Sequence, residues 1–171
     1  MKQKEIKTKR LTLAPFRAAD KDDLIRIVTD GEVGRTYMVP EDMTEEQKTA
    51  LFERYRALSL SDDKFAYGIY KDGRLIGFIH EVYKDGNGTE LGYVIDPAKK
   101  GNGYATEALS AAVNALFSSG CSAVIAAAFE ENKASLRVME KCGFKPTGDT
   151  EDIEYRGKTH KCIYMKTENK R

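Results

Sequence analysis

The chain has 171 residues, of which 41% are hydrophobic and 32% charged, a balance typical of a globular domain rather than of a disordered segment. Its 28 Lys and Arg residues nearly cancel its 27 Asp and Glu residues, and the net charge of +1 argues against a protein that works mainly by gripping nucleic acid. No apolar run approaches the roughly 20 residues of a membrane span, and no apolar segment follows the basic start as in a secretory signal. We therefore predict a single domain over residues 1–171, with neither a nucleic-acid nor a membrane partner.

The cysteines and histidines are too few and too scattered for a metal centre. Three Cys lie far apart, and this odd number indicates reduced thiols and a cytoplasmic location. Two His show no paired ligand spacing, so no metal is expected. The basic run from Lys2 to Arg10 is interpreted as a solvated tail.

The first third of the chain reads as strand, helix, loop and helix. A strand is predicted over Arg10–Phe16, where leucines alternate with polar residues. A helix capped by Asp20 follows, and Gly31–Pro40 is predicted to be a loop. Thr44 and Gln47 match a capping box that opens a second helix.

The middle of the chain is rich in strand signals. Phe65–Tyr70, Arg74–Val82 and Thr89–Ile95 are strand-like, and turn signals at 71–73 and 85–88 separate them. Three consecutive strands joined by turns form an antiparallel meander. A strictly βαβ nucleotide-binding fold would not contain one.

The last part alternates helix and strand. An apolar stripe over Ala105–Leu116 predicts a helix, and the small apolar residues of Cys121–Phe129 suit a central strand. Asn132 is predicted to cap the next helix. Ile153–Tyr155 and Lys161–Met165 indicate a closing hairpin.

The segment Thr89–Ala108 carries the chemistry, with the sequence TELGYVIDPAKKGNGYATEA. A strand runs into a glycine-rich loop, and a helix starts at once, so Gly101 and Gly103 let the backbone curl beneath unpaired helix amides. Such amides at the positive end of a helix dipole form a cradle for pyrophosphate, although the glycines alone would also suit a tight turn. Thr106 stands where a Rossmann loop needs its third glycine, and the Gly-Lys-Ser/Thr ending of a Walker loop is absent.

Four ordered motifs resemble the GNAT N-acetyltransferases over nearly the whole chain. KGNGYA at Lys100–Ala105 resembles their R/Q-x-x-G-x-G/A signature, and GYATEAL at Gly103–Leu109 resembles the branch of ribosomal-protein N-terminal acetyltransferases. KRLTLAPF, ELGYVIDP and NKASLRVMEKCGF agree in order and spacing. The resemblance implies an α/β (α+β) fold, a mixed and mostly antiparallel seven-stranded sheet flanked by helices and splayed between its fourth and fifth strands. Lys100 departs from the usual Arg or Gln and lacks the planar fork of Arg.

The resemblance also implies acetyl-CoA as cosubstrate and no metal. Backbone amides of the loop would hold its pyrophosphate, and the exposed strand edge would bind its pantetheine arm. The Val94 amide is a candidate oxyanion donor, with an ordinary ladder hydrogen bond as the alternative. Asn132 is expected against the arm, with a purely structural cap as the alternative. The expected cofactor-binding residues are Tyr93, Val94, Ile95, Lys100, Gly101, Asn102, Gly103, Tyr104, Ala105, Thr106 and Asn132.

Three residues are candidates for catalysis, one by the same resemblance and two by their position and acid–base chemistry. Many family members carry a Tyr that protonates the CoA thiolate where Met139 stands here, so Ser135 is expected to hydrogen-bond the thiolate instead. A capping role is the alternative for Ser135. Glu90 acting through water, or His80, is the candidate general base, with a satisfied sheet histidine as the alternative for His80.

These expectations describe an acyltransferase, an N-acetyltransferase that moves acetyl from acetyl-CoA to a primary amine by direct attack in a ternary complex. A protein N-terminal α-amine and a small-molecule amine remain open as acceptors. The acidic residues Glu41, Asp42, Glu45 and Glu46 would attract a cationic acceptor or simply begin a helix. A homodimer is suggested by the resemblance. The alternative function is a non-catalytic CoA-binding regulatory module.

Overall fold

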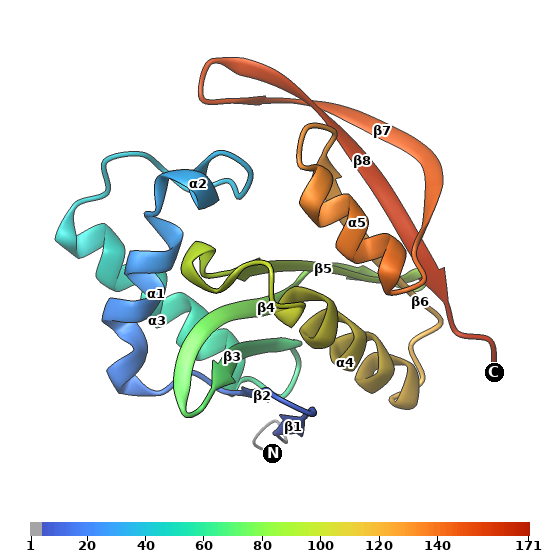
Figure 1. Ribbon diagram of the computed structural model, residues 1–171, viewed down its shortest axis with the longest axis horizontal. Coiled ribbons are helices and arrows are strands. Elements are labelled where there is room, and N and C mark those ends of the chain that lie inside the picture. The colour runs from blue at the N-terminus through green and yellow to red at the C-terminus, as the bar shows by residue number, and fades with distance from the viewer. Residues whose placement is uncertain (1–4) are drawn as a thin grey trace.

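The computed structural model describes residues 5–171, which form one sheet with helices on both faces (Figure 1). The strands are β1 (Ile6–Lys7), β2 (Thr12–Ala14), β3 (Ala66–Lys71), β4 (Arg74–Asp85), β5 (Gly88–Ile95), β6 (Ala123–Phe129), β7 (Lys145–Tyr155) and β8 (Lys158–Glu168). The helices are α1 (Lys21–Val28), α2 (Gly31–Gly34), α3 (Glu45–Leu60), α4 (Tyr104–Ser118) and α5 (Lys133–Lys141), with short 3₁₀ turns at Ala18–Asp20 and Pro97–Lys99. None of the helices in residues 5–171 is long and apolar enough to cross a membrane.

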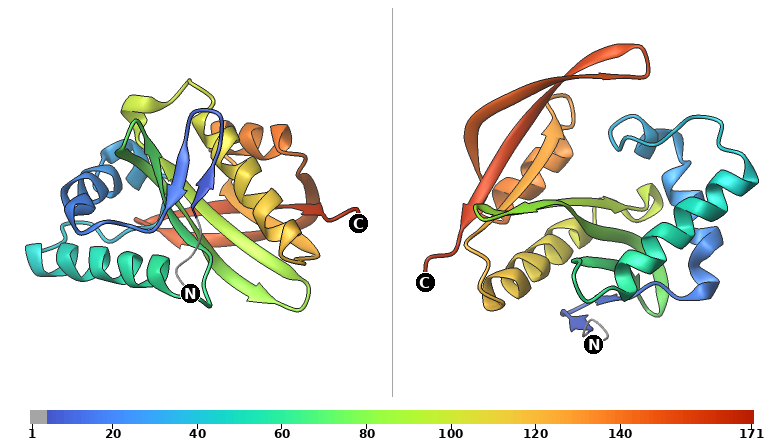
Figure 2. Two further views of the ribbon diagram at one scale, coloured as in Figure 1. Left: turned by 90° about the horizontal axis from the view of Figure 1, so that it is seen from below. Right: turned by 180° about the vertical axis from the view of Figure 1, so that it is seen from behind.

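The sheet separates two hydrophobic cores. Helices α1 and α3 cover one face, where Leu24 and Phe52 are almost fully buried. Helices α4 and α5 cover the other face, where Leu109 and Met139 are fully buried (Figure 2). The apolar stripes predicted for these helices therefore face the sheet, and they hold the helix ends at fixed positions along its strands.

The strand order is β1-β2-β3-β4-β5-β6-β8-β7, and the predicted meander is confirmed as β3-β4-β5. Its first turn has Asp72 at φ 49° and Gly73 at φ 77°, the positive angles that a two-residue turn needs to match the strand twist. Every pairing in the sheet of residues 5–171 is antiparallel except that of β5 with β6.

The parallel pair β5–β6 opens like a V. Its register covers only Thr89 with Val124, Glu90 with Ile125 and Leu91 with Ala126. Beyond Leu91 and Ala126 the two strands no longer pair with each other, which leaves the second half of β5 with a free backbone edge on the side away from β4. This confirms the splay that the family resemblance implied.

Some elements differ from the sequence expectation. The sheet has eight strands rather than seven, because Ile6–Lys7 adds β1 beside β2. The solvated-tail interpretation is therefore wrong for the described part of Lys2–Arg10, while residues 1–4 lie outside the described residues. The predicted loop Gly31–Pro40 begins with the short helix α2, whose first amides donate to the Asp30 carboxylate.

The closing hairpin is much longer than predicted. Almost every residue of β7 is exposed, so the strand has no alternation of apolar and polar residues to reveal it. Its backbone nevertheless pairs with β8 along most of its length.

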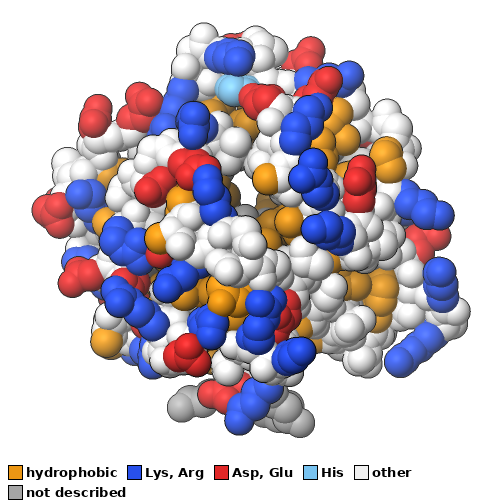
Figure 3. All heavy atoms as spheres, viewed as in Figure 1, with side chains coloured by type: hydrophobic (Ala, Val, Ile, Leu, Met, Phe, Trp, Pro, Cys, Tyr) orange, Lys and Arg blue, Asp and Glu red, His pale blue; other side chains and the backbone are white. Residues whose placement is uncertain are grey.

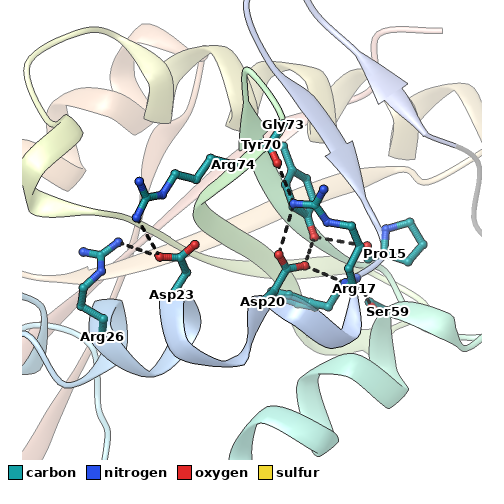
Figure 4. A network of polar contacts seen from close by, with 10 residues as sticks. Pro15, Arg17, Asp20, Asp23, Arg26, Ser59, Tyr70, Gly73 and Arg74 are labelled. Atoms are coloured by element: carbon teal, nitrogen blue, oxygen red, sulfur yellow. Dashed lines mark hydrogen bonds and ion pairs between the residues drawn. The ribbon is translucent and has the colours of Figure 1, made fainter.

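Helix caps are confirmed at two of three predicted positions. Thr44 and Gln47 form the capping box of α3, and Asn132 Oδ1 accepts a hydrogen bond from the Ser135 amide at 3.2 Å. The Asp20 prediction is wrong, because its carboxylate does not cap α1. It is buried and instead accepts from the Arg17 amide and the Tyr70 hydroxyl, each at 2.6 Å (Figure 4).

Candidate active site

The mouth of the V forms a cavity of about 480 Å³. Its walls are the half of β5 that does not pair with β6, the loop from Pro97 into α4, the first turns of α5, and α2. A space-filling view shows this hollow near the centre of the molecule (Figure 3). The cavity brings together most of the residues that the sequence predicted for the cofactor.

The loop before α4 presents a row of unpaired amides. Gly101 and Gly103 have φ angles of 78° and 79°, a left-handed conformation that side chains with a Cβ rarely adopt. In the described part of the chain, the amides of residues 101–106 donate to no backbone carbonyl. Of the seven predicted loop residues, Asn102 does not line the cavity and six do: Lys100, Gly101, Gly103, Tyr104, Ala105 and Thr106. A doubly charged pyrophosphate fits this array, since the amides lie at the positive end of α4.

The free edge of β5 also supplies backbone groups. The Asp96 amide donates to the Ile76 carbonyl at 2.7 Å, and hydrogen-bonded pairs alternate along an antiparallel ladder. The register of β4 with β5 therefore directs the backbone groups of Val94 toward Phe78 of β4. The interpretation of the Val94 amide as an oxyanion donor is wrong, because the groups that face the open side belong to Tyr93 and Ile95.

Ser135 and Tyr93 meet at the wall of the cavity. Their hydroxyl oxygens are 2.8 Å apart, and both residues line the cavity beside Asn132. Burial raises the pKa of Tyr93 to about 12, so its hydroxyl stays protonated at neutral pH. With Tyr93 donating to Ser135 Oγ, the Ser135 proton is left to donate into the cavity.

Met139, where many relatives have a Tyr, is fully buried in the core on the α4 and α5 face. It packs away from the cavity wall that Ser135 and Val138 form. The chemistry expected from a Tyr at this position therefore has no counterpart at Met139.

His80 is connected to the cavity through a tyrosine. Its Nδ1 is 3.1 Å from the Glu81 carbonyl, which can only accept, so Nδ1 carries the proton. Nε2 then accepts from the Tyr37 hydroxyl at 3.0 Å, and Tyr37 is hydrogen-bonded to Tyr55. Burial lowers the pKa of His80. His80 is a neutral base one hydrogen bond behind Tyr37, which lines the cavity.

Glu90 lies in the paired half of β5, and it is not among the described residues that line the cavity. Burial, and then the negative charge of Glu151, raise the pKa of its carboxyl. Tyr164 donates to Glu151 at 2.7 Å. Glu90 and His80 share one sheet face, with Gly92 between them, because a Cβ on Gly92 would lie 3.4 Å from His80 Nε2.

The rim of the cavity carries cations that the sequence reasoning did not use. Lys99, Arg137 and Lys141 line it together with Lys100, whose ammonium group is paired with Glu32 of α2. Lys and Arg side chains border the hollow in Figure 3. The spacing of Lys133, Arg137 and Lys141 along one helical face was a visible signal, since residues four apart are neighbours on a helix.

A second cavity, of about 620 Å³, adjoins the first and shares Glu32, Thr36, Asn132 and Ala134 with it. The tip of the β7–β8 hairpin forms one wall and reaches toward α2 (Figure 1). The Tyr155 hydroxyl donates to the Gly34 carbonyl at 2.6 Å and accepts from the Val39 amide at 3.3 Å.

Two more contacts shape this second cavity. Arg156 forms an ion pair with Glu41 at 3.3 Å. One of the acidic residues considered for binding a cationic acceptor therefore already has a cationic partner within the protein. His160, to which the sequence assigned no role, stacks on Phe129 and is hydrogen-bonded to Glu131.

A helix start with unpaired amides can hold an anionic group, and the free strand edge beside it can pair with an extended chain. A model of the acetyltransferase (GNAT) domain matches residues 10–145, most of the chain. The chain belongs to the GNAT family of N-acetyltransferases.

Individual proteins agree with this assignment. The uncharacterized N-acetyltransferase YoaA of Bacillus subtilis is 30% identical over 159 residues, which are 90% of each chain. An acetyltransferase from Salmonella typhimurium that modifies the N-terminal serine of ribosomal protein L7/L12 superposes with a TM-score of 0.83 at 16% identity, over 96% of this chain and 99% of that one.

Spermidine N-acetyltransferase from Vibrio cholerae, solved with CoA and spermine, superposes with a TM-score of 0.81 at 17% identity, over 95% of this chain and 97% of that one. Together these likenesses confirm the predicted fold and the predicted family.

Proposed function

We propose that this chain transfers the acetyl group of acetyl-CoA to a primary amine, by direct attack of the amine in a ternary complex. One observation carries the proposal: residues of the loop with unpaired amides, Gly101 and 103–106, line the same cavity as Ser135. A carrier held by its pyrophosphate at the loop thus has its reactive end within reach of a hydrogen-bond donor. The thioester supplies an activated acetyl group.

The cofactor is held mainly by main chain. The loop amides bind the pyrophosphate, assisted by Lys100 and by the dipole of α4. The free backbone groups of Tyr93 and Ile95 bind the amide-containing arm as an added strand would. Asn132 caps α5 through Oδ1 and turns its side-chain NH₂ to the arm, so its two roles combine. Val94 contributes shape rather than a backbone hydrogen bond.

Ser135 stabilises the departing thiolate. In the arrangement in which the Tyr93 hydroxyl donates to Ser135 Oγ, it polarises Ser135 and strengthens the hydrogen bond from Ser135 to the sulfur. A thiol of pKa near 8.5 is already a tolerable leaving group, so a hydrogen bond is sufficient where a full proton transfer from a Tyr is absent.

The amine must lose a proton, and two groups on the opposite sheet face are placed to receive it. Glu90 has a raised pKa, which makes its carboxylate a stronger base than an exposed one. His80 is neutral and connects to the cavity through Tyr37. An α-amine of pKa about 7.7–8.0 is neutral far more often at pH 7 than a lysine side chain of pKa about 10.4, so it needs less help from either base.

The acceptor enters from the second cavity, between α2 and the β7–β8 hairpin. Among structural neighbours, one enzyme modifies a protein N-terminal serine and another is a spermidine acetyltransferase. We propose that the acceptor of this chain belongs to one of these two classes, a peptide N-terminus or a small-molecule amine.

The test is to incubate the purified protein with acetyl-CoA and a panel of N-terminal peptides, polyamines, aminoglycosides and amino acids, and to follow the release of free thiol. We expect turnover with at least one acceptor, and loss of that turnover in S135A with CoA affinity kept. Tight CoA binding without turnover on any member of a broad panel would favour the non-catalytic regulatory module, and absence of CoA binding would overturn both.

A further inference from the structure

We propose that Arg10 is a positioning residue for the cofactor: it fixes the Asn102–Gly103 peptide so that the Gly103 amide faces the pyrophosphate of CoA. The inference rests on the proposed function and adds to it a residue from the far end of the chain. Arg10 lies in the turn between β1 and β2, outside the lining of the cavity.

Three contacts join Arg10 to the start of α4. Its Nη1 donates to the Asn102 carbonyl at 2.8 Å, and its Nε donates to Glu107 Oε2 at 2.7 Å. The guanidinium lies over the Tyr104 ring, 4.6 Å from the ring centroid. The planar fork of Arg can make all three contacts at once, which the single ammonium of Lys cannot.

The carbonyl contact sets the direction of an amide. A trans peptide holds its C=O and N–H on opposite sides. Because Arg10 binds the Asn102 carbonyl, the N–H of Gly103 in the same peptide unit points away from Arg10. Gly103 lines the cavity, so we infer that this N–H faces the cavity. Gly103 has no Cβ to restrict this peptide, so an external contact is needed to keep it in one orientation.

An earlier peptide unit of the loop, Lys100–Gly101, is held in the same way by a different residue. Asn102 Nδ2 donates to the carbonyls of Lys99 and Lys100, at 2.9 and 3.2 Å. The Lys100 contact turns the Gly101 amide outward by the same trans geometry. Two side chains therefore orient two glycine amides, Asn102 from within the loop and Arg10 from β1–β2.

Arg10 also neutralises a carboxylate beside the loop, that of Glu107. Glu107 lies in the first turn of α4, next to the place where phosphates would bind. Its Oε1 accepts from the Thr8 hydroxyl at 2.6 Å and from the Arg10 amide at 2.7 Å. Burial opposes the charge, but hydrogen bonds from Thr8 and Arg10 lower the pKa of Glu107, so it stays ionised and paired. Without Arg10, an uncompensated negative charge would repel the phosphates.

Arg17 offers a matched control, because it makes the same kinds of contact elsewhere. Its Nη2 binds the Asp20 carboxylate at 3.2 Å and the Gly73 carbonyl at 2.7 Å, and its guanidinium lies 4.5 Å from the centroid of Tyr70 (Figure 4). None of these groups lines the cavity in the described part of the chain. Removing Arg17 therefore measures what the loss of such an arginine does to the fold alone.

The experiment measures the Kd of CoA by calorimetry for the parent, R10A, R10K and R17A, with the melting temperature of each. We expect R10A to weaken CoA binding by about tenfold, the effect of one hydrogen bond to a charged group, with R10K between R10A and the parent. R17A should bind CoA like the parent although it melts lower. With an acceptor from the panel, R10A should raise the KM for acetyl-CoA and keep kcat.

A parent that binds no CoA would overturn the proposed function and this inference with it. A parent that binds, with R10A binding as tightly as R17A, would overturn the inference alone. If R10A does not fold, R10K decides: weaker CoA binding supports the positioning role, and binding equal to the parent's contradicts it.

Discussion

The candidate site has two halves, the two adjoining cavities, and they are built from different materials. The half proposed for the cofactor, the first cavity, consists mainly of main chain, the amides of the loop before α4 and the free edge of β5. The half proposed for the acceptor, the second cavity, consists of side chains from distant segments, among them Arg35, Tyr155 and His160. Backbone groups are present in every residue, so the first half depends on conformation, whereas the second depends on which side chains the fold brings together.

This difference has a physical consequence. A main-chain site tolerates changes of side chain but not of backbone freedom, so its sensitive positions are the glycines and the residues that orient them. A side-chain site loses one contact at a time, and the loss is graded. Substitutions in the first half should therefore have the largest effects on cofactor binding, and those in the second half smaller effects on the acceptor.

The largest effect is expected for G103V. Gly103 has a φ of 79°, and a Cβ there would lie 3.3 Å from Arg10 Nη2, so a β-branched residue distorts the loop. Backbone strain of this kind should weaken CoA binding about a hundredfold, measured by calorimetry. The control is G148V, which has a φ of 89° and open space around its Cβ on β7. A G103V protein with the CoA affinity of G148V would break the main-chain account.

The second-largest effect is expected on kcat rather than on the affinity for CoA. S135A removes the donor to the thiolate, so kcat should fall roughly thirtyfold while the Kd of CoA is kept, because a lost hydrogen bond to a charged group has this size. Y93F should lower kcat in the same direction by less, since Ser135 remains. S110A, which removes a half-buried hydroxyl on α4, is the control. Equal kcat values in S135A and S110A would contradict the role of Ser135.

The pH profile separates the two candidate bases. A base must be deprotonated, so kcat/KM should fall as the pH drops through its pKa. The charge of Glu151 raises the pKa of Glu90, and E151Q should therefore move the acidic limb to lower pH if Glu90 is the base.

The control for the pH profile is D152N, because neighbouring strand residues point to opposite faces. If E151Q leaves the acidic limb of the kcat/KM profile in place and H80Q abolishes it, the base is His80 and not Glu90.

The smallest effect is expected at the hairpin tip. Y155F removes the hydrogen bonds to Gly34 and Val39 that join β7–β8 to the α2 region. The acceptor wall becomes looser, so the KM of the acceptor should rise about threefold, less than the loss of one full hydrogen bond, with CoA affinity unchanged. Steady-state kinetics with varied acceptor check this. A variant that changes CoA affinity and leaves the acceptor KM alone would reverse the division between the two halves.

Most of the cofactor half was predictable from the sequence, because its signals are local. The glycines at 101 and 103, the helix start after them, and the cap at Asn132 depend on residues within a few positions of one another. The sequence resemblance added the splay of β5 from β6, which no local signal contains.

The errors arose where distant residues decide the outcome. The ladder register turned the Val94 amide toward β4, and the Tyr70 hydroxyl drew the Asp20 carboxylate away from the helix it was expected to cap. The long strand β7 is exposed on both faces, so only its pairing with β8 reveals it.

The sequence by itself determined the meander, the helices and a glycine loop suited to phosphates, since hydrophobic period and backbone freedom are properties of short segments. Only the tertiary structure decided that Arg10 holds the loop, that Tyr93 supports Ser135, and that Glu90 and His80 share one face. The physical reason is that a hydrogen bond between residues 92 positions apart, such as that of Arg10 to Asn102, depends on how the whole sheet places its strands and not on either residue's neighbours.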